Sequence, residues 1–368
     1  MRIGLVPFYT GRDGTAMRGA EEGQRPVRHM SFKILSLDGG GIRGVFVTAC
    51  LARLERQLNQ PLARYFDLIA GTSSGGFIAA LLGFGYSAAE VHGFFKGYGP
   101  RIFERRARRD PASMLVRRLI NPYLRRIGLE FEWLHGSRYR PDTFAWALKE
   151  LFGDRVLGGS KCRLVIPAVD LATGRVVVFK TPHRPGLVRD RKLLTRDVVL
   201  AACAAPTYFP HVTLGRGTAY TDGALWANNP GIVAYGEAMR IREHCRRRGI
   251  HPPFAEEDVR VLSIGTGKKH EFARPRPSDT GLKWWAPRIV DVMGNAQSEG
   301  TNFQMRYLLG PRYTRIDFAI PDASWRLDAV DKVDALEKEG FAKGDTFLPR
   351  LRQSFFDQAV PPYQPFRA

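Results

Sequence analysis

Residues 32–44 read FKILSLDGGGIRG, and this stretch decides the fold. An apolar run with strand character, Phe32–Leu37, leads directly into a glycine-rich string, Asp38–Gly44, and a helical pattern follows it. Because the string joins a strand to a helix, we expect its backbone amides to gather at the carboxyl edge of a sheet. Parallel α/β folds bind their ligands at that edge.

Similar apolar runs recur along the chain and alternate with helical patterns. The expected strands are Phe32–Leu37, Phe66–Ala70, Arg163–Val169, Val176–Phe179 and Val259–Ile264. A helix is expected over Val45–Leu58, where Val45, Ala49 and Ala52 share one face. The alternation predicts an α/β protein in which helices are layered on a central sheet.

The composition is that of a folded, strongly basic protein. Hydrophobic residues make up 44% of the 368 and charged residues 25%, so a sizeable core can be buried. The 56 Lys and Arg against 36 Asp and Glu give a formal net charge of +20. Such a charge favours an anionic partner, whether phospholipid, nucleotide or nucleic acid, and does not choose among them.

Cysteine usage and targeting signals point to the cytoplasm. The four cysteines are scattered without paired spacing, which favours reduced thiols and argues against a metal site. Residues 1–30 lack the apolar core of a secretory signal, and the longest apolar stretch, Leu68–Phe84, is interrupted by polar residues and glycines. We therefore expect any membrane contact to be peripheral.

The strongest local motif is Gly71-Thr72-Ser73-Ser74-Gly75, a G-x-S-x-G string between an expected strand and a helical run of small residues. This is the pattern of a nucleophile elbow, in which a sharp turn strains the serine backbone and leaves no room for neighbouring side chains. The Ser73 hydroxyl would then stand at a helix N-terminus, whose dipole favours developing negative charge. The same pattern occurs in ordinary glycine-rich turns, so it needs a second element beside it.

The glycine-rich string supplies that second element. The amides of Gly39, Gly40 and Gly41 can form an oxyanion hole, a device that contributes several kcal/mol of transition-state stabilisation in acyl transfer. Arg43 could add positive charge towards a phosphate head group. These residue types in this order point to attack by a serine on an ester.

A dinucleotide-binding loop is the rival hypothesis for the same string. Gly39-x-Gly41-x-x-Gly44 matches the dinucleotide fingerprint, including a strand before it and a helix after it. The acidic residue that would bind a ribose at the end of the second strand is absent, because that strand runs into the Ser73 motif. The oxidoreductase hypothesis is therefore a remote alternative.

A nucleophilic serine needs a base, and histidine is hard to supply here. None of the eight histidines stands in a recognisable loop after a strand with a carboxylate to orient it, so a His triad is the second choice. The better candidate is Asp222, in the turn-rich segment YTDGALWANNP at 220–230. An Asp beside a Gly is most often only a turn residue, so Asp222 gains weight from the other two motifs.

Taken together, DGGGIRG at 38–44, GTSSG at 71–75 and Asp222-Gly223 resemble the patatin-like phospholipases in order and spacing, over residues 32–320. The resemblance implies a three-layer α/β/α sandwich around a mostly parallel sheet. It also implies that Ser73 is the nucleophile and Asp222 the lone base, with an oxyanion hole around Gly39–Gly41 and no metal or cofactor. Ala224 stands where the family has a second glycine, a variation that such proteins also show.

A narrower resemblance concerns regulation. FKTPH at 179–183 and NFQ at 302–304 are similar to bacterial patatin effectors of antiphage systems of the CBASS type. The resemblance implies that a cyclic oligonucleotide switches the enzyme on to degrade phospholipid at the inner membrane. A constitutive bacterial lipase is the alternative. We expect no nucleic acid polymer as a partner, because the aromatics do not pair with basic residues as in a nucleic-acid module.

The sequence predicts a chain of three parts. We expect an N-terminal tail at 1–30, a catalytic domain at 31–320 and a C-terminal extension at 321–368 that packs on the same domain. A basic amphipathic stretch, Arg101–Arg126, would suit an anionic membrane surface or a solvated helix face equally. Head-group preference depends on a cap region within 85–160, and the sequence leaves both this preference and the oligomeric state open.

Overall fold

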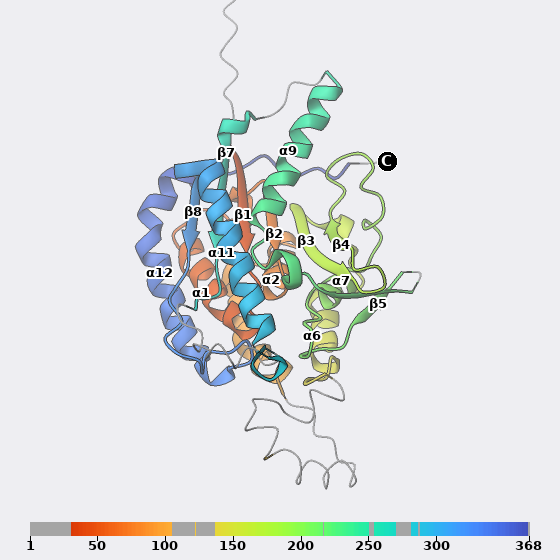
Figure 1. Cartoon of the computed structure of the whole chain (residues 1–368). Helices are drawn as coiled ribbons and strands as arrows, with labels where there is room; N and C mark the ends of the chain where they lie inside the picture. Colours follow the sequence, from red (N-terminus) through yellow and green to blue (C-terminus); the bar gives the residue numbers. More distant parts are fainter. Residues whose placement is uncertain are drawn as a thin grey trace, which may run out of the picture.

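The computed structural model describes residues 31–104, 122, 137–215, 217–249, 254–269, 281–285 and 288–366. Over these residues a central sheet of eight strands is flanked by helices (Figure 1). The strands are β1 (Phe32–Leu37), β2 (Leu68–Gly71), β3 (Arg163–Asp170), β4 (Val176–Lys180), β5 (Val212–Leu214), β6 (Thr218–Asp222), β7 (Val259–Ile264) and β8 (Tyr313–Ile316). The predicted α/β class is confirmed.

The sheet is mixed, with a parallel centre. Its strand order is β5-β6-β3-β2-β1-β7-β8, and β4 pairs with β3 beside this path. The strands β3, β2, β1, β7 and β8 are parallel to one another in this order, whereas β4, β5 and β6 pair antiparallel. β1 is buried along its whole length, as expected for a central parallel strand that is covered on both faces.

Helices cover both faces of the sheet, so the predicted three-layer sandwich is also confirmed. The helices are α1 (Gly44–Glu55), α2 (Ser74–Gly83), α3 (Ala88–Ile102), α6 (Asp142–Phe152), α7 (Thr195–Ala202), α8 (Ala224–Ala227), α9 (Gly231–Arg247), α10 (Leu282–Trp285), α11 (Ile289–Leu309) and α12 (Val333–Ser354). Leu35 and Leu37 of β1 join a large core with α1, α2 and α12. Ile34 points to the opposite core, which α9 and α11 cover.

The C-terminal residues are part of this sandwich. Helix α12 packs along α1, and Gly340 allows the close approach, because a Cβ there would lie 2.4 Å from the Phe46 carbonyl oxygen. Buried Lys33 of β1 donates through Nζ to the carbonyl oxygens of Phe355 and Gln358, at 3.0 and 2.9 Å. After α12, the chain therefore returns to contact its first strand, β1.

Two of the expected segments fall mostly or wholly beyond the part of the chain that the structure describes. The tail 1–30 lies outside it, and so does the basic stretch Arg101–Arg126 except for 101–104 and 122. No helix among the described residues is long and apolar enough to cross a bilayer.

Candidate active site

Ser73 lies in the sharp turn between β2 and α2, with φ 53° and ψ −126°. A positive φ is rare for a residue with a side chain, and such strain clusters at functional sites. The flanking glycines are required sterically: a Cβ on Gly71 would lie 2.1 Å from the Gly75 carbonyl oxygen, and one on Gly75 would lie 2.3 Å from that of Leu37. The geometry is that of a nucleophile elbow at the start of a helix.

Asp222 ends β6, and its buried carboxyl lies beside the Ser73 hydroxyl. Oδ1 accepts a hydrogen bond from the Ala224 amide at 2.8 Å, whereas Oδ2 has no well-formed hydrogen bond to any described residue. Burial raises the pKa of Asp222 to about 6, and the Ser73 hydroxyl and Ala224 amide act in the opposite direction. A buried carboxylate of raised pKa is a stronger proton acceptor than an exposed one.

Gly223 lets this strand end approach its neighbour. A Cβ at this position would lie 2.4 Å from the Pro167 carbonyl oxygen of β3, so any side chain would push β6 away. Asp222 is held from the other side as well, since its amide donates to the Ala204 carbonyl at 3.1 Å. The carboxyl is therefore fixed by backbone on both sides, which preorganises it towards Ser73.

The glycine loop lies against Ser73, and its three amides are not equivalent. The Gly39 amide donates to the Asn228 carbonyl at 3.0 Å, and the Gly40 amide donates to the Ser74 hydroxyl at 3.1 Å. Gly41 has φ +57°, and its amide makes no hydrogen bond to a described residue. The amide of Gly39 is thus engaged in holding the loop, whereas that of Gly41 is free of hydrogen bonds to the described residues.

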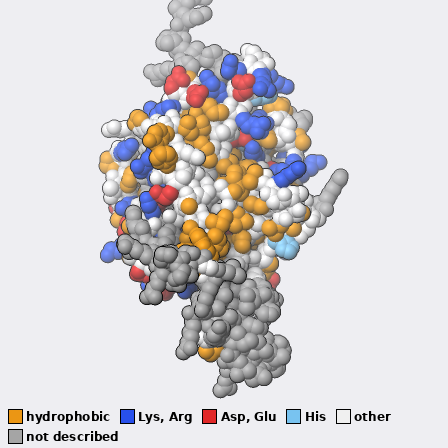
Figure 2. Space-filling model, viewed as in Figure 1, with side chains coloured by type: hydrophobic (Ala, Val, Ile, Leu, Met, Phe, Trp, Pro, Cys, Tyr) orange, Lys and Arg blue, Asp and Glu red, His pale blue; other side chains and the backbone are white. Residues whose placement is uncertain are grey.

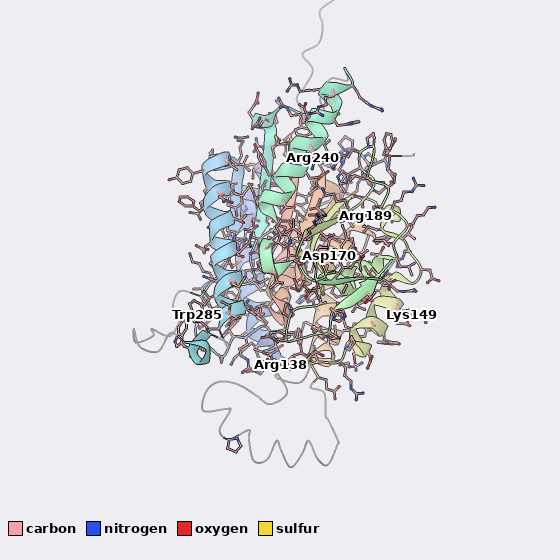
Figure 3. The ribbon with its side chains drawn as sticks, turned by 45° about the vertical axis from the view of Figure 1, so that its right-hand side comes forward. Arg138, Lys149, Asp170, Arg189, Arg240 and Trp285 are labelled. Carbon is pink, nitrogen blue, oxygen red and sulfur yellow. The ribbon has the colours of Figure 1, made fainter. Side chains whose placement is uncertain are left out.

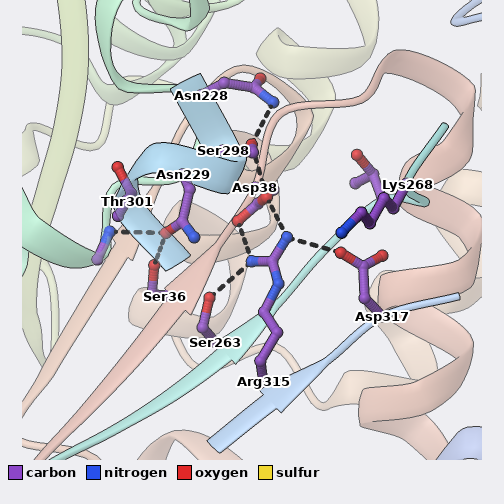
Figure 4. Close-up of polar contacts among 12 residues, drawn as sticks. Ser36, Asp38, Asn228, Asn229, Ser263, Lys268, Ser298, Thr301, Arg315 and Asp317 are labelled. Atoms are coloured by element: carbon purple, nitrogen blue, oxygen red, sulfur yellow. Dashed lines mark hydrogen bonds and ion pairs between the residues drawn. The ribbon is translucent and has the colours of Figure 1, made fainter. Parts of the chain in front are cut away.

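An ion network that the sequence did not reveal holds the start of this loop (Figure 4). Arg315 of β8 binds Asp38 through two hydrogen bonds of 2.8 and 2.7 Å, and it also donates to Asp317 at 2.7 Å. Ser298 of α11 donates to Asp38 at 3.1 Å and accepts from the Asn228 amide group at 2.9 Å. Burial raises the pKa of Asp38 to about 6, while the charge and hydrogen bonds of Arg315 lower it.

The pocket around Ser73 has a polar end and an apolar end. The polar end includes Arg43, whose Nε has no hydrogen-bond partner among the described residues. Burial lowers the pKa of Arg43, and the carboxylates of Asp291 and Asp317 raise it. The apolar end is lined by aromatic rings: Phe77, Phe94, Phe95, Phe103, Phe144 and Phe209. Such a cleft suits an amphipathic ligand with an acyl chain and an anionic group.

No described histidine lines this pocket. His92 contacts Thr48 and Glu337, and His183 contacts Thr181 and Glu237, so both are engaged elsewhere. His29, His135, His251 and His270 are not among the described residues. The geometry gives no support to a His triad with Ser73, and Asp222 is the base candidate that the structure brings to it.

Comparison with known proteins gives the family. Residues 35–235, more than half of the chain, match the family described as patatin-like phospholipase. The chain belongs to the patatin-like phospholipase family. The matched range contains the glycine loop, Ser73 and Asp222. The resemblance noted in the sequence is confirmed, and with it the prediction of a carboxylic-ester hydrolase.

Three relatives of this patatin-like phospholipase carry the name cGAMP-activated phospholipase. The one from Pseudomonas aeruginosa is 34% identical over 343 residues, which cover 92% of each chain. The one from Vibrio cholerae is 35% identical over 64% of this chain and 64% of its own length. The one from Escherichia coli is 34% identical over 69% of this chain and 66% of its own. The dinucleotide-dependent oxidoreductase hypothesis is therefore set aside.

Proposed function

We propose that this patatin-like phospholipase cleaves an acyl ester of membrane glycerophospholipid with Ser73 and Asp222, and that a cyclic oligonucleotide switches it on. The strained serine at the start of α2, with a buried carboxylate of raised pKa beside it, carries the proposal. Degradation of the cell's own bacterial membrane by such an enzyme would serve antiphage defence.

The reaction follows from the positions of these groups. The Ser73 oxygen attacks the ester carbonyl while Asp222 Oδ2 takes its proton, and the oxyanion binds the Gly40 and Gly41 amides. As this oxyanion forms, the Gly40 amide exchanges its hydrogen bond to the Ser74 hydroxyl for one to the oxyanion. Collapse of the tetrahedral intermediate leaves acyl-Ser73, and protonated Asp222 returns the proton to the departing alkoxide. Water then attacks acyl-Ser73 while Asp222 accepts its proton. Collapse of this second intermediate releases the fatty acid as Asp222 returns the proton to the Ser73 oxygen.

The apolar and polar ends of the pocket determine where the acyl chain and the phosphate of the substrate bind. The phenylalanine-lined end holds the acyl chain, because apolar burial is the main driving force available there. Arg43 is directed to the phosphate, since a guanidinium is a strong ligand for phosphate oxygens and Nε of Arg43 has no hydrogen-bond partner among the described residues. In this role Arg43 contributes to head-group binding rather than to the oxyanion hole.

Activation by a cyclic oligonucleotide is supported by the name that the three relatives share. The match to one of these relatives covers 92% of this chain. The net charge of +20 suits both an anionic nucleotide and an anionic bilayer. We also propose a cytoplasmic protein that contacts the inner membrane peripherally when active. A constitutive lipase that docks on lipid without an activator remains the second candidate.

Fatty-acid release from anionic phospholipid vesicles tests the proposal. Wild type and Ser73→Ala are each assayed alone, with cGAMP, and with a panel of other cyclic di- and trinucleotides. Release that needs both Ser73 and one nucleotide supports the switched enzyme. Release that needs Ser73 but no nucleotide assigns the constitutive lipase, and release that persists in Ser73→Ala would overturn the assigned nucleophile.

A further inference from the structure

Helix α11 exposes an apolar ridge along its outer face. Six residues form this ridge, which we call the α11 ridge: Ile289, Met293, Ala296, Gly300, Phe303 and Tyr307. Phe303 is 62% exposed and Tyr307 78% exposed, and their rings pack together at 4.7 Å between centroids. Hydrophobic side chains gather over α11 on the face that Figure 2 shows.

The helix is amphipathic in the reverse sense to an ordinary surface helix. Its inner face is largely polar and serves the active site: Ser298 holds Asp38, and Gln297 accepts from the Asn229 amide at 2.9 Å. Its outer face carries the large apolar side chains, although Met305 and Leu309 on the inner side reach the core. Contiguous exposed apolar surface of this kind marks an interaction site.

The spacing of the α11 ridge fits a second helix. Its members follow one another at intervals of four, three, four, three and four residues, the repeat of a coiled-coil seam. The order of sizes is symmetric, with two large residues at each end and Ala296 and Gly300 between them. In an antiparallel pair of identical helices, Ile289 would face Tyr307, Met293 would face Phe303 and Ala296 would face Gly300.

We propose that the α11 ridge of one copy packs antiparallel against the α11 ridge of a second copy around a two-fold axis. Such an isologous contact uses the same patch on both subunits, as a C2 dimer requires. The small residues lie at the crossing point, where a Cβ on Gly300 would meet nothing within 4 Å, so the two helices have room to approach. The α11 ridge contains none of the residues assigned to the proposed reaction.

The area and charge of the surface agree with this pairing. The exposed parts of Ile289, Met293, Phe303, Tyr307 and neighbouring Leu308 amount to roughly 500 Å² per copy, when a whole side chain is taken as ~200 Å². Two copies would remove about 1,000 Å² of apolar surface, the lower bound for a specific interface before polar flanks are counted. Glu299, beside Gly300 in the middle of α11, is paired with Lys268 at 2.6 Å and brings no unpaired carboxylate to this region.

A bilayer is the other surface that could cover apolar side chains near the pocket. Trp285 lies at the end of the molecule where α11 begins, on the same end as Arg138 (Figure 3), and Met293 is one of the residues that line the pocket. However, Phe303 and Tyr307 lie ten or more residues further along the helix, which rises ~1.5 Å per residue. A bilayer would not require the symmetric spacing of the α11 ridge, whereas a second copy of the chain would. A second copy is therefore favoured over lipid as the partner of this surface.

The oligomeric state of the full chain tests the interface. Sedimentation velocity over a range of concentrations, with and without cGAMP, compares wild type with Phe303→Glu/Tyr307→Glu. The control pair is Leu171→Glu/Val188→Glu, which places the same charges on other exposed apolar residues, 48% and 54% exposed. We expect a dimer whose dissociation constant rises at least ~30-fold in the ridge variant and does not change in the control.

Cross-linking tests the register without disturbing the aromatic residues. Ala296→Cys/Gly300→Cys should form a disulfide-linked dimer with oxidised glutathione, because each cysteine faces its counterpart across the axis. Lys338→Cys/Ala342→Cys on the outer face of α12 is the matched control and should stay free of the cross-link.

A wild-type chain that is monomeric under every condition would overturn the proposal, as would a dimer that the ridge substitutions leave intact. If the chain is monomeric and the ridge substitutions abolish vesicle binding instead, the ridge is a membrane contact and the dimer is ruled out.

Discussion

The carboxyl of Asp222 is buried, with the residue 1% exposed, and its pKa is raised from 3.8 to about 6. Ionising it at neutral pH therefore costs the folded state ~3 kcal/mol relative to the unfolded chain. Because the folded pKa lies above the unfolded value, this cost is absent below pH 3.8, where the carboxyl is neutral in both states, and it is complete once the pH has risen through about 6. The group that the reaction needs as a base thus lowers the stability of the resting enzyme.

Asp222→Asn should separate the two effects. The amide keeps the shape and can accept from the Ala224 amide, but it cannot take the Ser73 proton. We expect ester hydrolysis to fall by ~10²–10⁴-fold, while the free energy of unfolding at pH 7 rises by about 1–3 kcal/mol. Hydrolysis and urea unfolding are measured on the same preparations, and unchanged hydrolysis would exclude Asp222 as the base.

The pH dependence of hydrolysis gives an independent check on Asp222. A base must be ionised to accept a proton, so kcat/KM for a soluble short-chain ester should rise with pH and level off above about pH 6. A rising limb near pH 4 would indicate an exposed carboxylate, and one near pH 7 with a second inflection would return attention to a histidine. The assay uses a soluble ester so that vesicle charge does not distort the profile.

Single residues also differ in how far the sequence could predict them. Ser73 and Asp222 were predictable because each stands beside glycines that the turn or strand end requires, and those glycines are visible in the sequence. Arg315 was not predictable. It lies 277 residues beyond Asp38, and its role follows only from the pairing of β1 with β7 and of β7 with β8, which brings the two side chains to one edge. Whether these residues act as assigned stays a prediction.

At the scale of elements, apolar runs predicted the central strands well and the peripheral elements poorly. The run Val259–Ile264 coincides with β7, and Phe66–Ala70 differs from β2 by two residues at its start and one at its end. The edge strand β8 was missed, because Tyr313–Ile316 is short and carries an arginine. Helix α12 was missed as well, since it buries only a narrow stripe of its largely polar surface.

The contact between α12 and α1 predicts a position-specific effect of alanine. Gly340→Ala would place a methyl group 2.4 Å from the Phe46 carbonyl oxygen and force the helices apart, so we expect a loss of about 1–3 kcal/mol of stability. Gly236→Ala in α9 meets nothing within 4 Å and should gain ~0.5–1 kcal/mol from helix propensity. Urea unfolding of both variants against wild type checks the pair, and equal effects would contradict the packing.

At the scale of the whole molecule, we propose that the catalytic domain at 31–320 and the extension at 321–368 form one folding unit. The extension supplies α12 to the main core, and the Leu327 carbonyl accepts from the Ile42 amide of the glycine loop at 2.9 Å. A boundary at 320 is therefore convenient for description and does not separate two stable parts.

Deleting residues 321–368 should accordingly abolish the folded state and not merely activity. The truncated chain would expose the face of α1 that α12 covers and would leave Lys33 buried without its carbonyl partners. We expect no cooperative thermal transition and a loss of near-ultraviolet circular dichroism. A truncated protein that melts cooperatively would show that the catalytic part folds alone.

The net charge leads to a prediction about lipid preference. With 56 basic against 36 acidic residues, binding to vesicles that contain anionic lipid should exceed binding to neutral phosphatidylcholine vesicles. The difference should shrink as the salt concentration rises from about 0.05 to about 0.5 M, because the Debye length falls below ~5 Å. Co-sedimentation of Ser73→Ala measures binding without lipid breakdown, and salt-independent binding would point to apolar contact alone.

The contacts between β1 and the residues after α12 also determine when the fold can be completed during synthesis. Lys33 obtains its Phe355 partner only after a further 322 residues have been made, and Ile42 waits for Leu327 in the same way. At ~5–20 residues per second the ribosome needs on the order of 20–60 s to cover that interval. A nascent chain cannot complete these contacts during this time, so a lipid-degrading enzyme is assembled only after the residues that follow α12 have been made.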